Sequence, residues 1–304
     1  MIRYTAFCKV VELGSFTKAA EVLGYTQAAV SQMIRSLEEE MGLVLLNRAH
    51  GGIRMTPEGE QMYPYIQKTV SAIRTARDKA REIGELDEGE IRIGTISSIS
   101  QHWMPRLIKK FTEKYPHVKF HLYQSDISIM RDWLRTGYID LCFIYQEGIS
   151  GFKNTMLARD SFMAVLPENH PLTRHTSIAL DMLADVPLIA AEEGDISTVM
   201  TAFQNLSLTP QIQYRVHDDY TILAMIEQGL GISILPAMVL DHTNYRFHAL
   251  PTVPTINRSI GIASKEPELL PIAARRFLEF LYDNLEDCIT GQYTSLVEGN
   301  RNSG

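Results

Sequence analysis

The sequence predicts three parts: a small N-terminal domain of short helices with a β-hairpin, one long helix, and a larger α/β domain. Two short helical segments with a tight turn between them, over residues 15–40, indicate the first part. Apolar residues in a seven-residue repeat between Met62 and Ile83 indicate the second. Strands that alternate with helices from Ile91 onward indicate the third. The length of 304 residues allows two or three domains, each with its own core.

Composition argues against a membrane or secreted protein. Hydrophobic residues make up 45% of the chain and charged residues 21%, and no apolar run approaches the ~20 residues of a membrane span. Arg3 is followed at once by an amphipathic segment, which is not the pattern of a signal peptide. The three cysteines lie far apart, without metal-ligand spacing: Cys8, Cys142 and Cys288. We therefore expect a cytoplasmic protein with reduced thiols.

The net charge of −7 is unevenly distributed. Residues 1–86 hold 11 Lys and Arg against 10 Asp and Glu, whereas residues 87–304 hold 18 against 26. The acidic excess lies in the C-terminal part, so it does not count against a locally basic N-terminal surface. The nearly neutral N-terminal part predicts a modest nonspecific affinity for DNA, because few phosphates can be neutralised at once.

A pair of capped helices is predicted within residues 15–40. Ser15 can cap the first helix, Gly24 can end it in the left-handed conformation, and Thr26 can cap the second helix. The second helix has an apolar face formed by Val30, Met33, Ile34 and Leu37. Its opposite face is small and polar with one cation, and consists of Gln27, Ala28, Ser31, Gln32 and Arg35. Such a face can enter a DNA major groove, although a plain helical hairpin with a solvated outer face is the alternative.

Residues on either side of this pair add candidate phosphate contacts. Residues 2–13 form a further predicted helix behind it, and Thr17 and Lys18 lie in an opening helical turn that suits a phosphate. A strand at residues 44–48 and a returning strand at 53–55 predict a small wing. Its candidate DNA-backbone contacts are Arg48, His50 and Arg54. A solvated surface residue is the alternative for each of these cations.

The next segment is a predicted long helix. Pro57 suits the first helical position, and Glu58 and Glu60 oppose the positive end of the helix dipole. A heptad seam typical of a two-stranded coiled coil follows at Met62, Ile66, Thr69, Ile73, Ala76, Ala80 and Ile83. A helix packed on its own domain is the alternative.

The rest of the chain predicts two α/β units with mostly parallel sheets and helices on both faces. Strands are expected at residues 91–94, 118–123, 139–145, 162–166, 187–191, 211–216 and 259–263. Helices are expected near residues 97–111, 130–135, 199–206, 220–228 and 271–284. The polar tail from residue 292 onward is expected to be disordered.

These segments together resemble the LysR-type transcriptional regulators. The family's run of Ser-Phe-Thr, a basic residue, Ala-Ala, then Gln-x-Ala-Val-Ser and a closing Leu-Glu corresponds to residues 15–38. The match continues through residues 45–48, 55–59, 221–223 and 229–236, and covers nearly all of the chain to about Leu285.

The resemblance implies a division into domains and a set of partners. It implies a winged helix-turn-helix over residues 1–57, a linker and dimerisation helix over 58–86, and an effector-binding domain over 87–291, similar to a periplasmic solute-binding protein. Lobe I of that domain would hold residues 87–162 and 265–291, lobe II residues 163–264, and a disordered tail residues 292–304. The implied partners are double-stranded promoter DNA, a small-molecule effector, further copies in a homodimer or homotetramer, and RNA polymerase. No cofactor, metal or membrane partner is expected.

Ligands of open α/β sheets bind beyond the carboxyl ends of strands, close to helix N-termini. In this chain the rule selects the segment 192–198 broadly, and the following residues in particular: Ser97, Ser98, Ser100, Ser125, Asp126, Ile127, Ser128, Tyr145, Gln146, Ile196, Ser197, Thr198, His217, Asp218 and Asp219. Each of them taken singly could be a cap or turn residue. Family members often carry glycine where Asp126 stands, and a carboxylate there disfavours a carboxylated effector. We expect an uncharged, hydroxylated or cationic effector.

An enzyme is the rival class. Cys142 lies in an apolar segment, and neither a Gly-x-Ser-x-Gly nor a His-Glu-x-x-His motif occurs. His117 and His121 could share a strand face, but no third metal ligand is evident near them. The sequence therefore predicts no catalytic constellation.

The sequence thus predicts a cytoplasmic, sequence-specific transcription factor with a small-molecule effector. Base reading is expected from Gln27, Ala28, Ser31 and Gln32. Backbone positioning is expected from Thr17, Lys18, Arg35 and Arg48. Many family members have Arg where Gln32 stands, so the preferred bases would differ, because Arg favours guanine and Gln favours adenine. The alternatives are an effector-independent repressor, and a solute-binding or catalytic module with an appended DNA-binding domain.

Overall fold

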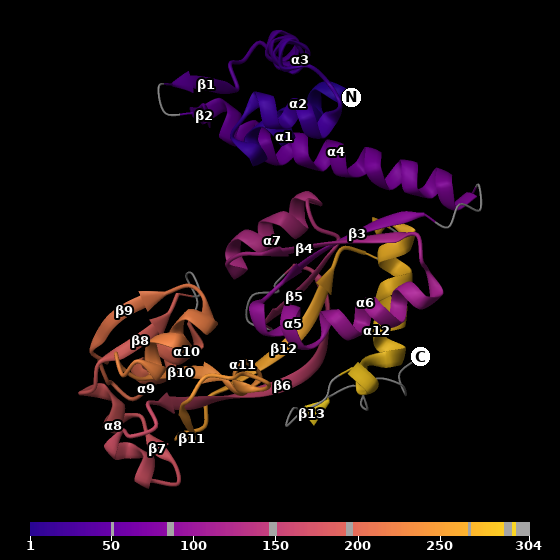
Figure 1. Ribbon diagram of the computed structural model, residues 1–304. Coiled ribbons are helices and arrows are strands. Elements are labelled where there is room, and N and C mark those ends of the chain that lie inside the picture. The colour runs from indigo at the N-terminus through magenta and orange to yellow at the C-terminus, as the bar shows by residue number, and fades with distance from the viewer. Residues whose placement is uncertain are drawn as a thin grey trace. The chain divides into compact units, whose positions relative to one another are not determined.

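A computed structural model describes residues 1–49, 52–83, 88–145, 151–192, 197–266, 269–288 and 294–295 (Figure 1). The structure divides into two units, Met1–Leu86 together with Trp133–Ile139, and Asp87–Asp132 together with Asp140–Gly304. Within the described residues, no helix combines the length and the apolar character that crossing a bilayer requires.

The first unit is a helical domain with a two-stranded wing. Its elements are α1 (Ile2–Leu13), α2 (Phe16–Leu23), α3 (Gln27–Met41), β1 (Leu46–Ala49), β2 (Gly52–Met55) and α4 (Pro57–Ile83). The predicted caps are confirmed: the Ser15 hydroxyl accepts the amide of Lys18, and the Thr26 hydroxyl accepts the amide of Ala29. Strands β1 and β2 pair antiparallel, as expected for a wing.

A shared core holds the three short helices to the start of α4. Phe7, Val30 and Leu37 are fully buried in it, and Ile66 on α4 is 1% exposed. The heptad prediction is therefore wrong at Ile66, which packs inside its own domain, and at Met62, which packs against the same core. These first turns of α4 follow the alternative interpretation, a helix packed on its own domain.

Lobe I of the second unit begins with three parallel strands. They are β3 (Gly89–Thr95), β4 (Val118–Gln124) and β5 (Leu141–Tyr145). The connecting helices are α5 (Ser97–His102), α6 (Met104–Lys114) and α7 (Ile127–Thr136). Strand β12 (Asn257–Ser264) then pairs antiparallel with β5, and α12 (Ile272–Cys288) packs on α6 and β3. Trp103, Phe111, Phe143 and Phe277 are buried together in this core.

Strand β6 (Lys153–Leu166) runs through both lobes. Its first part pairs with β12, and its last part pairs with β10 (Ser233–Pro236) and β11 (His248–Val253). Lobe II also contains β7 (Ile178–Ala179) beside β11, and a separate parallel pair of β8 (Leu188–Ala191) and β9 (Ile212–Val216). Its helices are η2 (Pro171–Arg174), α8 (Asp181–Ala184), α9 (Thr198–Asn205), α10 (Asp219–Glu227) and α11 (Ala237–Leu240).

Three expectations for the second unit need correction. The nine-stranded sheet is mixed rather than mostly parallel, because β12, β10 and β11 all run antiparallel to β6. Strand β12 pairs with β5 and so belongs to lobe I, whereas the boundary at residue 264 placed it in lobe II. Within the tail expected to be disordered, Thr294–Ser295 form β13 beside β6. The other residues of 292–304 lie outside the described part of the chain.

Candidate functional site

The polar face of α3 is exposed on the first unit. Gln27, Ala28, Gln32 and Arg35 are exposed and Ser31 is half-buried, while Val30, Ile34 and Leu37 on the opposite face are buried. The amphipathic pattern therefore orients the helix as the sequence predicted. The arrangement presents amide, hydroxyl and guanidinium groups outward, which are groups that can hydrogen-bond to base edges and phosphates.

Further predicted contacts flank this face. Thr17 and Lys18 are exposed in the first turn of α2, and Arg54 is exposed on β2. Arg48 lies on β1, but its side chain is outside the described part of the structure, as is all of His50.

The wing is anchored to α3 by a carboxylate. Glu38 on α3 accepts the backbone amides of Leu45 and Leu46 at 2.8 and 3.1 Å, which fixes the start of β1 relative to the helix. The entry to α4 is fixed by Thr56, whose hydroxyl donates to the carbonyl of Val44 and accepts the amide of Gly59. Gly59 approaches this strand so closely that a Cβ would lie 2.1 Å from the carbonyl oxygen of Leu45.

The later part of the predicted seam is less buried than its start. Thr69, Ala76 and Ala80 are exposed on α4, and Ile73 is half-buried. Ile83 ends the helix, but its side chain is not described. These positions, at steps of three and four, retain the spacing of a helix-pairing face.

A cleft of about 220 Å³ opens in the second unit. Strand ends and loops of both lobes line it: Thr95, Ile96, Ser97, Gln124, Ser125, Asp126, Ile127, Tyr145, Ala191, Glu192, His217, Asp218 and Asp219. Most of these residues follow the carboxyl ends of β3, β4, β5, β8 and β9, which is where the sheet rule placed a ligand.

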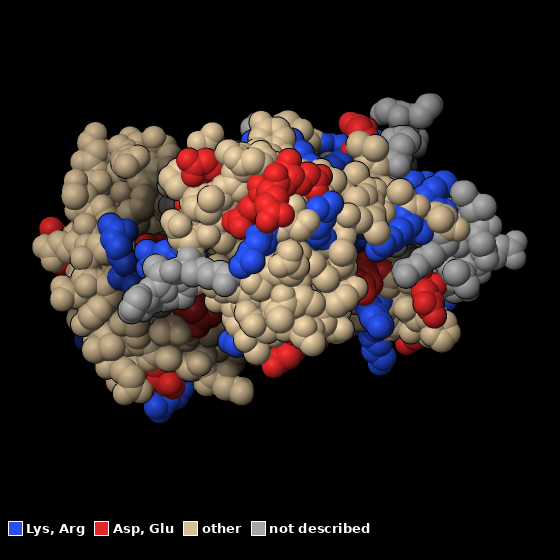
Figure 2. All heavy atoms as spheres, turned by 90° about the horizontal axis from the view of Figure 1, so that it is seen from above, with Lys and Arg blue, Asp and Glu red and all other residues tan. Residues whose placement is uncertain are grey.

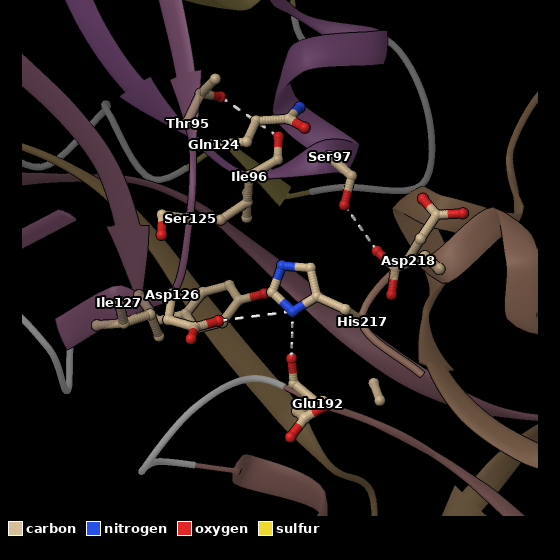
Figure 3. A pocket seen from close by; sticks show the side chains of 13 residues that line it. Thr95, Ile96, Ser97, Gln124, Ser125, Asp126, Ile127, Glu192, His217 and Asp218 are labelled. Atoms are coloured by element: carbon tan, nitrogen blue, oxygen red, sulfur yellow. Dashed lines mark hydrogen bonds and ion pairs between the residues drawn. The ribbon is translucent and has the colours of Figure 1, made fainter. Parts of the chain in front are cut away.

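Two polar contacts join the lobes across this cleft (Figure 3). The Ser97 hydroxyl at the start of α5 donates to Oδ2 of Asp219 on α10 at 2.9 Å. His217, from the end of β9, places Nδ1 3.6 Å from Oδ1 of Asp126 before α7, and 3.1 Å from the carbonyl oxygen of Glu192. Burial raises the pKa of Asp219, although the hydrogen bond from Ser97 opposes this.

A buried ion pair lies where the chain crosses between the lobes. Arg258 on β12 donates from Nε to Oδ2 of Asp160 on β6 at 2.8 Å, and the two side chains are 2% and 0% exposed. Arg258 also donates to the Tyr145 hydroxyl at 2.6 Å and to the Ser98 hydroxyl at 3.0 Å. Burial lowers the pKa of Arg258, but Tyr145 and Asp160 raise it by more, so the guanidinium stays charged.

The structure brings together eight of the predicted effector residues. Those that line the cleft are Ser97, Ser125, Asp126, Ile127, Tyr145, His217, Asp218 and Asp219. Glu192, at the start of the predicted segment 192–198, lines it as well. Gln146 and Ile196 lie outside the described residues.

Five predicted residues do not line the cleft. Ser98 is buried against Arg258, and Ser100 accepts a hydrogen bond from Gln124. Ser197 caps α9 and Thr198 is the first residue of that helix, while Ser128 lies within the first turn of α7. Of these five, Ser197 follows the alternative interpretation, in which such a residue caps a helix, because its hydroxyl accepts the amide of Met200.

Sequence reasoning missed other residues that the structure places at the cleft. Thr95 and Gln124 are the last residues of β3 and β4, Ile96 follows β3, and Ala191 ends β8. Their position at strand ends was a usable signal, but their residue types were not distinctive. Among the described residues, no group of three or more His, Cys, Asp and Glu side chains is placed to hold a metal ion.

Comparisons with known proteins cover most of the chain. Residues 84–286 match the LysR substrate binding domain, and residues 3–60 match the bacterial regulatory helix-turn-helix protein, lysR family. The uncharacterized HTH-type transcriptional regulator YvbU of Bacillus subtilis is 30% identical over 276 residues, which are 90% of this chain and 94% of YvbU. The HTH-type transcriptional regulator BenM of Acinetobacter baylyi is 30% identical over 243 residues, which are 78% of this chain and 79% of BenM. A full-length OxyR variant from Pseudomonas aeruginosa has a TM-score of 0.68 at 25% identity, with 94% of each chain covered.

A helix-turn-helix with an exposed polar helix, linked to a two-lobed domain with a cleft, defines a DNA-binding transcriptional regulator with a domain for an effector. The chain belongs to the LysR family, which confirms the resemblance in its motifs. The matched families and relatives are transcriptional regulators and not enzymes.

Proposed function

We propose that this chain recognises a specific DNA sequence with α3 and changes that recognition when a small molecule occupies its cleft. The observation that carries the proposal is the exposed polar face of α3, held above a buried core within the matched helix-turn-helix. The cleft between two lobes of the matched substrate-binding domain supplies the regulatory site.

The proposed division of labour on DNA follows the chemistry of the exposed groups. Gln27, Ala28, Ser31 and Gln32 read base edges, and an amide at Gln32 favours adenine. Backbone phosphates are contacted by Thr17, Lys18, Arg35, Arg48, His50 and Arg54.

Charge supports a binding mode in which base contacts matter more than bulk attraction. Residues 1–86 hold 11 Lys and Arg against 10 Asp and Glu, and the face drawn in Figure 2 carries side chains of both kinds. Nonspecific affinity is then modest for one subunit. We propose that pairing through α4, at Thr69, Ile73, Ala76, Ala80 and Ile83, gives a homodimer or homotetramer in the cytoplasm that contacts two half-sites. RNA polymerase is the proposed partner of the promoter-bound assembly.

Effector action is proposed to be a shift between two arrangements of the lobes. The contacts of Ser97 with Asp219 and of His217 with Asp126 join the lobes across the cleft. A ligand that engages these side chains alters the balance between joined and separated lobes. It does so only to the extent that it binds one arrangement more tightly.

In vitro selection of a random duplex library with the full-length protein tests the DNA-binding part of the proposal. We expect one enriched motif, and we expect Gln32→Ala to relax its preference by about 1–3 kcal/mol at one base pair. Gln204→Ala, at an exposed glutamine on α9, is the matched control and should leave the motif unchanged. A library that stays random with the parent protein would refute sequence-specific recognition.

A further inference from the structure

The lining of the cleft has one sign of charge. Four carboxylates face it, from Asp126, Glu192, Asp218 and Asp219, and the described lining residues include neither Lys nor Arg. We infer that the ligand of this cleft is a small cation, such as a primary amine or a guanidine. This inference rests on the proposed function of the cleft as the effector site.

Asp126 is the side chain best placed to receive the positive group. Its Oδ1 atom is inaccessible to solvent and receives no hydrogen bond from the described residues, since His217 Nδ1 stays 3.6 Å away. A buried carboxylate oxygen without a donor is costly to maintain. In Figure 3 the His217 ring points between the Asp126 carboxylate and the backbone of Glu192. An ammonium at this position would donate to Oδ1 of Asp126 and to the Glu192 carbonyl oxygen that His217 now contacts.

Helix N-termini at the cleft favour anions in principle, since each carries a partial positive charge of roughly half a unit. At the starts of α7 and α10 the protein's own carboxylates lie close to those ends, whereas α5 starts at the cleft without a side-chain cap. Asp218 caps α10 and accepts the amide of Thr221 at 2.7 Å, and Asp126 directly precedes α7. An incoming carboxylate would therefore meet like charges at both helix ends.

The nearest buried cation does not reverse this balance. Arg258 is paired with Asp160 and does not line the cleft. Tyr145, which accepts a hydrogen bond from Arg258, lines the cleft instead of Arg258. Burial raises the pKa of Asp219, and the hydrogen bond from Ser97 and the charge of Arg258 oppose this only in part. A cationic ligand beside Asp219 would favour the ionised form of its carboxyl group.

Cavity size limits the ligand to a small molecule. A cavity of ~150 Å³ holds benzene, with its six carbon atoms, so a cleft of about 220 Å³ suits a molecule of about nine non-hydrogen atoms. Ile96, Ile127 and Ala191 give it apolar wall, while Ser97 and Ser125 offer hydroxyls. A short alkyl or aryl chain with one cationic end fits these features.

Pairs of probes with similar carbon skeletons and opposite charges test the inference with the full-length protein. Thermal shift and calorimetric titration would compare the affinity of each amine with that of a carboxylate of similar size: benzylamine with benzoate, butylamine with butyrate, and ethanolamine with glycolate. At least one amine should bind, and the carboxylate paired with it should not. Asp126→Asn should weaken that amine at least about tenfold, because a charge-assisted contact is lost. Asp181→Asn, at an exposed aspartate of lobe II outside the cleft, is the matched control and should bind like the parent.

Each other outcome counts against the inference. Binding of a carboxylate in preference to its amine overturns the charge assignment but leaves the cleft as the effector site. Equal amine affinity in the parent and Asp126→Asn overturns the placement of the cation. If neither the amines nor the carboxylates bind, the inference is overturned. The duplex selection then decides separately whether the chain is a DNA-binding regulator. If Asp126→Asn without ligand melts at the same temperature as the parent protein, the variant is folded.

Discussion

Arg258→Met is predicted to destabilise the second unit by about 3–5 kcal/mol, the typical cost of removing one partner from a buried ion pair. The structural reason is that the Asp160 carboxyl group would lose the guanidinium that pairs with it, at a position where its side chain is 0% exposed. The hydroxyls of Tyr145 and Ser98 would also lose their donor. Because the pair joins β6 and β12 where the chain crosses between lobes, the loss should affect the whole unit.

Urea unfolding followed by tryptophan emission measures this cost. Trp103 is 1% exposed in the core of lobe I, and a Trp133→Phe background makes it the reporter of that unit. The matched control is the double variant Arg258→Met with Asp160→Leu, which replaces both charges by apolar groups of similar size. It should recover at least half of the lost stability, because an apolar pair in place of a buried ion pair is often neutral or stabilising.

Two results would refute the reasoning. A loss below about 1 kcal/mol for Arg258→Met would show that water or rearrangement compensates the unpaired Asp160. A double variant as unstable as the single one would show that packing, and not charge, fixes this crossing.

Three further predictions concern single positions. Gly59→Ala should destabilise the first unit by about 1–3 kcal/mol or more, because its Cβ would meet the Leu45 carbonyl at 2.1 Å. Glu38→Ala should cost the same unit about 1–3 kcal/mol, since two backbone amides at the start of β1 lose their acceptor. Asp219→Asn should make the second unit more stable than the parent at neutral pH, and the difference should vanish as the pH falls. Burial raises the pKa of Asp219, so the fold favours its protonated form and loses that contribution as the pH rises through the folded-state pKa.

Denaturant unfolding of each variant beside the parent checks all three. Glu38→Gln retains a carbonyl acceptor and should recover most of the loss at that position. An unchanged Gly59→Ala would mean that α4 can shift away from the strand at little cost. A parent protein more stable than Asp219→Asn at neutral pH would show that the hydrogen bond from Ser97 outweighs the burial of the charge.

The helix-turn-helix was predictable because its determinants are local. Ser15, Gly24 and Thr26 are caps within a few residues of the helices they bound, and helical periodicity separates the buried from the exposed face of α3. The prediction of a heptad seam was wrong at Ile66, because periodicity shows that one face of a helix is apolar and cannot show what covers that face.

The cleft was partly predictable, since strand ends and helix starts are visible in the sequence. Hydroxyl residues there were ambiguous: Ser97 faces the cleft, whereas Ser98, one residue further, points to the buried Arg258. The length of β6 was missed, since the predicted strand began at residue 162 whereas β6 begins at Lys153. Arg258, the partner of Asp160 on this strand, lies 98 residues away from it, and pairing at that distance leaves no local signal.

The most direct test of the account is the affinity of the full-length protein for its selected duplex, with and without a saturating concentration of the amine that binds the cleft. The account predicts that the amine changes duplex affinity, that the duplex changes amine affinity by the same factor, and that Asp126→Asn removes both effects. Equal duplex affinity and an equal footprint with and without bound amine would contradict it.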